Sequence, residues 1–238
     1  NNTITGNTLY NAGRDVVQHT GAENLTLTHN TIYGTNVGDL TRDLGCTYAI
    51  ATSYMHSEIA YNRIYDDGYT YAGIYLDGYG ENAWVHHNVI SGMRYAILLN
   101  SPIAYTLEHN TADPLAGYRS LTGIVDDSVP EELNRMVIRN NILPEYTQDF
   151  GDGTTWEGNV EGPADLHWVD PGAGDYRLAA DSGAIDAGPD LGYAIDAAGN
   201  PVYGRPDTGA LEYQPPWEIG SDAIPVGAEV RQIGRAHV

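Results

Sequence analysis

The chain has 238 residues, of which 42% are hydrophobic, and a formal net charge of −21. This length allows one elongated body with a sizeable core, and the 28 glycines suit a fold with frequent turns. Eleven arginines and no lysine, against an excess of acidic residues, exclude the basic surface that nucleic acid and anionic membranes require. The single cysteine, Cys46, excludes an internal disulfide framework, and no apolar run approaches membrane-spanning length.

A six-residue motif returns along the first part of the chain. Each copy has an apolar residue, two variable residues, an Asn, one further residue and an apolar or small residue. The six copies are Ile4–Leu9, Leu27–Ile32, Ile59–Ile64, Val85–Ile90, Leu107–Ala112 and Val137–Ile142. Their asparagines are Asn7, Asn30, Asn62, Asn88, Asn110 and Asn140. A spacing that wanders around roughly two dozen residues indicates a solenoid whose coils differ in loop length.

The segments between these asparagines carry short alternating runs, such as Leu25–Leu27, Gly73–Asp77 and Ala96–Asn100. Such runs are typical of strands with one buried face and are too short for amphipathic helices. We therefore predict an all-β chain that folds as a parallel β-helix. An Asn at the same turn of every coil tolerates a left-handed conformation and bonds to the next coil, so we expect a structural ladder.

Polar residues end several of the predicted strands. If the apolar residue of each motif fixes the register, five strands align, namely Val16–His19, Ile50–Ser53, Ile74–Asp77, Ile97–Asn100 and Ile124–Asp127. Their first and third residues point inward, and their fourth residues form an outward column of His19, Ser53, Asp77, Asn100 and Asp127. With rungs about 4.8 Å apart, this row is a candidate sugar-binding groove, and Tyr75 lies beside it.

Two long loops add charged residues near this groove. The longest interval in the repeat carries Arg42 and Asp43, and a later coil carries Asp66 and Asp67 directly before its strand. Long loops on a rigid scaffold are where binding groups collect. The histidine pair next to Asn88 is interpreted as loop-facing, and no clustered spacing of ligand residues indicates a metal site.

Carboxylates near the groove suggest glycoside hydrolysis. That reaction needs two carboxyl groups, close together for retention and about 6.5–9.5 Å apart for inversion. The candidate catalytic residues are Asp77, Asp67 and Asp43, and the candidate substrate-binding residues are His19, Arg42, Asp66, Tyr75, Asn100 and Asp127. The same aspartates also suit turns, because a glycine follows several of them.

The chain divides into three parts. Residues 1–163 hold the coils and end in a partial repeat at Trp156–Val160. Residues 164–213 are rich in Gly, Pro and Asp, and we expect them to cap the open end of the last coil. The tail, residues 214–238, has no period, and its last six residues resemble the translation of a sequencing adapter. The sequence opens inside a coil, so we expect further coils and any export signal to precede it.

The stretches GRDVVQH, RDLGCTYA, IAYNRIYDDG, AGIYLDGYGENAWVHHNVI and YAILLN, followed by DYRLAADSGAIDAG and DTGALEY, carry a family resemblance. Residues 1–213 resemble the right-handed parallel β-helix proteins of the pectate-lyase-like superfamily, and more narrowly the secreted bacterial members assigned to carbohydrate breakdown. The resemblance implies a right-handed coil and an extracellular or cell-surface location. It leaves the reaction open, because the superfamily includes lyases, hydrolases, esterases and inactive surface proteins.

Three functions are therefore weighed. The first is a monomeric glycoside hydrolase that acts on a polysaccharide and needs no cofactor. The second is a lyase for a uronate polymer, which in this superfamily uses Lys or Arg as base, often with calcium. The absence of lysine leaves Arg42, Arg63 or Arg94 for that role. The third is a non-catalytic surface solenoid whose acidic loops bind calcium or nothing.

Overall fold

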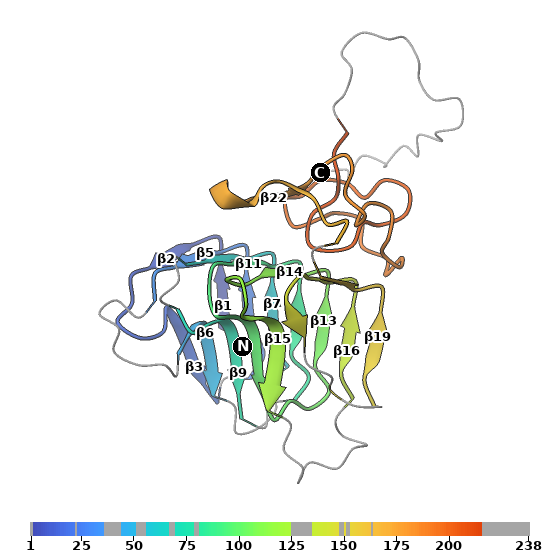
Figure 1. The fold of residues 1–238 in the computed structure, drawn as a ribbon. Helices are drawn as coiled ribbons and strands as arrows, with labels where there is room; N and C mark the ends of the chain where they lie inside the picture. The colour runs from blue at the N-terminus through green and yellow to red at the C-terminus, as the bar shows by residue number, and fades with distance from the viewer. Residues whose placement is uncertain are drawn as a thin grey trace, which may run out of the picture.

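The computed structural model describes residues 2–215, except residues 22, 36–43, 51–55, 67–69, 79–80, 125–134, 148–149, 151–152 and 163. In this part of the chain, nearly all regular structure is β, and successive strands wind into a right-handed parallel β-helix (Figure 1). The predicted fold is confirmed. The helix has three faces, each of which is a parallel sheet.

The three parallel sheets take one strand from each coil. Sheet A consists of β1 (Asn2–Thr5), β4 (Leu25–Thr28), β7 (Glu58–Ala60), β10 (Trp84–His86), β13 (Thr106–Glu108), β16 (Val137–Arg139) and β19 (Thr155–Glu157). Sheet B consists of β2 (Thr8–Tyr10), β5 (Thr31–Tyr33), β8 (Arg63–Tyr65), β11 (Val89–Ser91), β14 (Thr111–Asp113), β17 (Ile142–Leu143) and β20 (Val160–Glu161). Sheet C consists of β3 (Val17–Thr20), β6 (Gly45–Ile50), β9 (Ala72–Asp77), β12 (Tyr95–Asn100), β15 (Arg119–Ile124) and β18 (Tyr146–Thr147).

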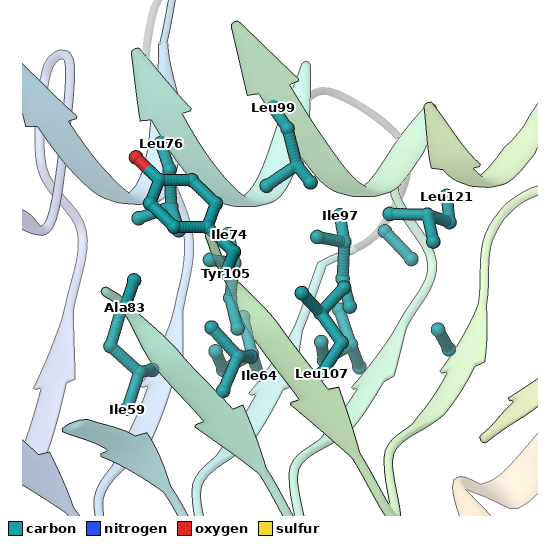
Figure 2. Close-up of a cluster of buried hydrophobic side chains, with 14 of the residues drawn as sticks. Ile59, Ile64, Ile74, Leu76, Ala83, Ile97, Leu99, Tyr105, Leu107 and Leu121 are labelled. Carbon is teal, nitrogen blue, oxygen red and sulfur yellow. The ribbon is translucent and has the colours of Figure 1, made fainter. Parts of the chain in front are cut away.

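The core runs along the axis of the helix, because each strand turns alternate side chains inward. The middle residues of the sheet A strands stack in register, as Ile59, Val85 and Leu107 do. Sheet C adds inward residues such as Ile74 and Ile97, and all of these side chains are 0–1% exposed (Figure 2). Full burial of one such side chain contributes roughly 1.5–3 kcal/mol. The short alternating runs in the sequence therefore fold into rungs that share one core.

The ladder predicted from the repeated asparagines is present. Each Asn Oδ1 accepts the backbone N–H of the ladder Asn in the preceding coil, as Asn88 does from Asn62 at 3.1 Å. Each Nδ2 donates to a carbonyl of that coil, as Asn88 does to Ile59 at 2.8 Å. One prediction is wrong, because Asn141 occupies the sixth position and Asn140 lies beside it. The ladder members are Asn7, Asn30, Asn62, Asn88, Asn110, Asn141 and Asn159.

The left-handed residue of each coil precedes the ladder Asn, whereas we predicted the Asn itself. The residues with positive φ at this corner are Gly6, His29, Tyr61, His87, His109, Asn140 and Gly158. The rings among them stack along the helix, with centroids 4.8, 4.9 and 4.7 Å apart from His29 to His109. We call His29, Tyr61, His87, His109 and Asn140 the corner column. Stacking offsets part of the cost of left-handed backbone for residues other than glycine.

The segment after the coils carries the 3₁₀ helix η2 (Pro171–Ala173) and an antiparallel pair, β21 (Trp168–Asp170) and β22 (Asp175–Leu178). The C-terminal module, which we define as residues 164–213, packs on the side of the helix (Figure 1). Tyr193 bonds to Glu108 of sheet A, and Tyr176 bonds to Asp113 of sheet B. The module also contacts the last described coil, where the Thr208 hydroxyl donates to the Gly158 carbonyl at 3.4 Å, while Trp156 in β19 remains 39% exposed. The expected cover over the open end stays a prediction.

Candidate functional site

Sheet C holds the predicted polar column, but in a different register. Thr47, and not Ile50, pairs with Ile74, so that Ile50 lies opposite Asp77. Between β9 and β12 the predicted register is correct, and it places Asn100 next to Asp77. The alignment of β6 is therefore wrong by three residues. Loops of different length precede these strands, and the apolar pattern of β6 fits either alignment.

The register also removes His19 from the outward column. His19 pairs with Ala49, which pairs with Leu76, and both partners are fully buried members of the core. Burial lowers the pKa of His19 to about 4. His19 is therefore a neutral imidazole among the inward-facing residues. The sequence predicted it at an outward position, where it would hold substrate.

The remaining predicted loop residues lie outside the described part of the chain. These residues are Arg42, Asp43, Ser53, Asp67 and Asp127. Where the strand before Asp127 is described, Ile124 is the residue that lies opposite Asn100. The predicted register of this strand is wrong by three residues, because Leu121, and not Ile124, pairs with Ile97.

Asp77 is the best-defined member of the site, at the end of β9. Its Oδ2 accepts a hydrogen bond of 2.7 Å from the Tyr48 hydroxyl, and its Oδ1 accepts one of 2.7 Å from the Asn100 amide. The Ser101 hydroxyl donates in turn to Asn100 Oδ1 at 3.2 Å, which fixes the orientation of that amide. Two short hydrogen bonds to one carboxylate hold it in a single orientation. Asp77 is half-buried, so it keeps contact with solvent.

Tyr75 packs against Tyr48, the residue that donates to Asp77. Its ring meets the Tyr48 ring edge-on with centroids 4.9 Å apart, and both rings cluster with Ala72 and Leu98. Tyr75 is only 7% exposed. Its ring therefore presents no open face for a sugar, and in this structure it positions Tyr48 against Asp77.

Glu81 is a second carboxylate near Asp77 that the sequence reasoning missed. Burial is the main cause that raises the pKa of Tyr105, and the charges of Asp77 and Glu81 raise it further. Both carboxylates therefore lie within electrostatic reach of the Tyr105 hydroxyl. That hydroxyl is buried and has no hydrogen-bond partner among the described residues. The sequence contained a signal for Glu81, because this acidic residue follows Asp77 by four positions, after two glycines.

Asp66 does not belong to this group. Its backbone N–H donates to the carbonyl of Ser91 on sheet B, and its charge lies near Cys46. Burial first, and then Asp66, raises the pKa of that thiol. Cys46 lies near the start of β6, whereas Asp77 ends β9, which separates the two regions by roughly 13 Å along the strands. The sequence predicted Asp66 as a substrate-binding neighbour, and the structure places it at the opposite end of sheet C.

A second polar cluster lies where sheet A meets the C-terminal module. We define the sheet A cluster as Glu58, His86, Glu108, Arg139 and Tyr193. His86 Nε2 lies 3.3 Å from Glu58 Oε1. Glu108 pairs with Arg139 and accepts a 2.8 Å bond from the Tyr193 hydroxyl. Burial alone would raise the pKa of Glu108, but these hydrogen bonds outweigh it and lower the pKa below its usual value.

His86 of this cluster and the neighbouring His87 are buried, which corrects their interpretation as loop-facing residues. His86 and His87 are 1% and 2% exposed, and their Nδ1 atoms lie 3.0 Å apart. Burial lowers the pKa of His87 to about 2 and that of His109 to about 4. Neutral imidazoles at a closed interface have a structural role. The cluster joins the module to the helix through the bond from the Tyr193 hydroxyl to Glu108.

Among the described residues, no group of three or more His, Cys, Asp or Glu side chains is arranged to hold a metal ion. The part of the chain that the structure describes also has no helix that is long and apolar enough to cross a membrane.

No protein-family model matches the chain, and a search of the curated proteins found no match to it. The structure establishes the parallel β-helix directly. Membership of the pectate-lyase-like superfamily stays a prediction from sequence resemblance.

Proposed function

We propose that this protein is a carbohydrate-active β-helix protein of the pectate-lyase-like type and a glycoside hydrolase that acts on a polysaccharide. The observation that carries the proposal is the Asp77 carboxylate, which is half-buried and held by Tyr48 and Asn100. An oriented, negatively charged carboxylate on a rigid sheet suits attack on, or stabilisation of, an oxocarbenium-like transition state. Polysaccharide is accordingly the partner that we propose.

The two-carboxylate mechanism assigns different roles to Asp77 and its partner. Asp77 serves as nucleophile or general base, because the Tyr48 hydroxyl and the Asn100 amide hold its carboxylate in a single orientation. The second carboxyl group donates a proton to the leaving oxygen. Glu81 is the described candidate for that acid. Asp43 and Asp67, together with Asp127, remain candidates outside the described residues.

The oligomeric state, location, partners and cofactors that we propose are those expected from the sequence. The protein works as a monomer outside the cell or on its surface, and neither a nucleic acid nor a membrane is its partner. The hydrolase needs no cofactor. Calcium is assigned to the alternatives, in which a uronate lyase or a non-catalytic solenoid would bind it through acidic loops.

Activity assays on the purified chain separate these functions. We expect release of reducing ends from one member of a panel of neutral and acidic polysaccharides. Replacement Asp77→Asn should lower the rate by at least about 100-fold, which is the usual contribution of a positioned acid or base. Glu81→Gln should produce a comparable loss. Asp190→Asn is the matched control, because Asp190 is an exposed turn residue of the module and Asn preserves its acceptor.

Three outcomes would contradict the hydrolase. Full activity of Asp77→Asn would remove Asp77 from the mechanism. Absorbance of an unsaturated uronate product would identify a lyase. Silence on every polysaccharide, with calcium added and the fold intact by circular dichroism, would favour the non-catalytic solenoid.

A further inference from the structure

A cleft separates sheet B from the C-terminal module, away from Asp77. It has a volume of about 270 Å³. The lower wall comes from the coil of β8 and from Val89 of β11, and the upper wall comes from β22 and two further segments of the module. Figure 1 shows β22 above the strands of sheet B. The lining residues used below are Tyr61, Arg63, Val89, Asp175, Arg177 and Leu211.

Two arginines bring positive charge to this cleft in a chain of net charge −21. Arg177 is held by Asp175 through a bidentate pair, with Nη2 2.6 Å from Oδ2. Arg63 donates from Nη2 to the carbonyl of Gly174 at 3.2 Å, and its guanidinium lies over the Tyr65 ring at 5.2 Å. The lining residues supply two guanidinium groups and one carboxylate, and a further carboxylate, Asp113, is bound by the hydroxyl of the lining Tyr176.

Arg63 keeps donors for a ligand. A guanidinium has five N–H donors, and the bond to Gly174 is the one side-chain hydrogen bond that it makes among the described residues. Gly174 fits closely against the Arg63 guanidinium, because a Cβ at position 174 would lie 2.7 Å from Arg63 Nη2. Gly174 also has a φ of 75°, which glycine adopts readily. The backbone therefore holds the Arg63 side chain beside the cleft while its remaining donors stay available.

The other walls suit the rings of a small sugar. Val89 and Leu211 supply apolar surface, and Tyr61 supplies the edge of an aromatic ring whose faces stack on His29 and His87. The volume lies just below the range of about 300–1,000 Å³ that is typical of small-molecule sites. A single sugar residue or a chain end matches this size better than an extended polymer does.

We propose that this cleft is a second carbohydrate site, which binds a carboxylate-bearing sugar residue through Arg63. A carboxylate accepts two parallel bonds from a guanidinium, and the apolar walls contact the face of the sugar ring. The two guanidinium groups locally offset the repulsion between an acidic sugar and the acidic surface. The site is separate from Asp77 and does not depend on the hydrolase.

Titration of the full chain with D-glucuronate tests the proposal, followed by chemical shifts in nuclear magnetic resonance spectra. D-glucose is the neutral counterpart, and inorganic phosphate is the anion without a sugar ring. We expect glucuronate to bind at least about tenfold more tightly than either probe, and we expect its shifts to map to residues of β8 and β22. Loss of one charge-assisted bond costs about 1.5–3 kcal/mol, so Arg63→Gln should weaken glucuronate binding by about 10- to 100-fold.

Two controls make the result specific. Arg135→Gln changes the charge equally at an exposed residue before β16 of sheet A and should leave glucuronate binding unchanged. Asp77→Asn should also leave it unchanged, so that failure of the hydrolase and failure of this site are distinguishable. Equal binding of glucose, equal binding of phosphate, absence of glucuronate binding, or full binding by Arg63→Gln would each overturn the proposal.

Discussion

Single asparagines satisfy the backbone of two coils at once. Asn88 is fully buried, and its amide donates to the carbonyls of Ile59 and His86 while its Oδ1 accepts from the backbone of Asn62. Removal of this side chain would take a hydrogen bond from three backbone groups, of which the His86 carbonyl still accepts from the Tyr61 N–H. Because a buried polar group without a partner costs about 1–3 kcal/mol, each ladder residue in the middle of the helix carries a large share of the net stability.

Replacement Asn88→Ala should therefore lower the free energy of unfolding by at least about 3 kcal/mol. Asn7→Ala is the matched control, since Asn7 occupies the same motif position but is exposed on the first described coil. There we expect a loss below about 1 kcal/mol, because water can replace the lost bonds. Urea unfolding followed by circular dichroism measures both. Equal losses in the two variants would show that the ladder is no stronger in the interior.

At the scale of elements, the corner column forms the seam between the coils and the C-terminal module. Tyr193 of the module contacts the His87 and His109 rings at centroid distances of 4.5 and 5.0 Å. Asn140 completes the column and donates to the carbonyl of Asp207 in the module. Around His87, His109 and Asn140 the seam is buried and contains titratable rings, so module docking is linked to pH.

Acid should weaken this seam. The pKa of His109 is about 4 in the folded protein, against about 6.5 when unfolded, so the folded state binds fewer protons between these values. Its contribution to stability is full above pH 6.5 and falls as the pH drops toward 4. The charged groups that face it are Glu108, Arg139 and the neighbouring histidines. The 2.5-unit difference corresponds to a loss on the order of 3 kcal/mol.

The variant His109→Asn isolates this effect. Asn tolerates the left-handed backbone, as Asn140 does in the next coil, and it does not titrate. Between pH 6.5 and pH 4, the variant should lose less stability than the wild type. The difference should reach about 3 kcal/mol, which is the loss assigned to His109. Hydrogen exchange of the module amides and chemical denaturation at each pH provide the measurement. Parallel pH profiles for the two proteins would contradict the linkage.

At the scale of the whole molecule, the net charge affects the stability of the fold. A net charge of −21 on one elongated body causes self-repulsion that favours the unfolded chain. The ion pairs of the described residues include Arg139 with Glu108 and Arg177 with Asp175, and they involve few of the acidic groups. Long-range repulsion is therefore only partly offset within the fold.

Screening this repulsion should stabilise the protein. When the ionic strength rises from about 0.01 M to about 0.15 M, the Debye length falls from about 30 Å to about 8 Å. We expect a gain of about 1 kcal/mol, which corresponds to a rise in Tm of about 2–4 °C for a chain of this size. Calorimetry in sodium chloride and in tetramethylammonium chloride should give the same increase. A fall in Tm would contradict the prediction, and an additional gain from micromolar calcium would reveal a calcium site.

The amino-acid sequence alone predicted the fold and most of the ladder. Both depend on a local pattern, since the apolar residue, the Asn and the next strand of each coil lie within a few residues of one another. The same local reading placed Asp77 next to Asn100, because the segments that lead from these two residues to the next ladder Asn are similar in length. Where two neighbouring asparagines fitted the motif, the pattern did not distinguish Asn141 from Asn140.

The tertiary structure decided what depends on contacts between distant segments. The register of β6 and the inward position of His19 follow from pairing across loops of unequal length. The side position of the C-terminal module and the Arg63 cleft join residues about one hundred positions apart. Strand register is set by the packing of the whole rung, because an odd shift would turn the inward side chains of a strand outward. Local sequence therefore determined the coil, and packing determined which side chains meet on its surface.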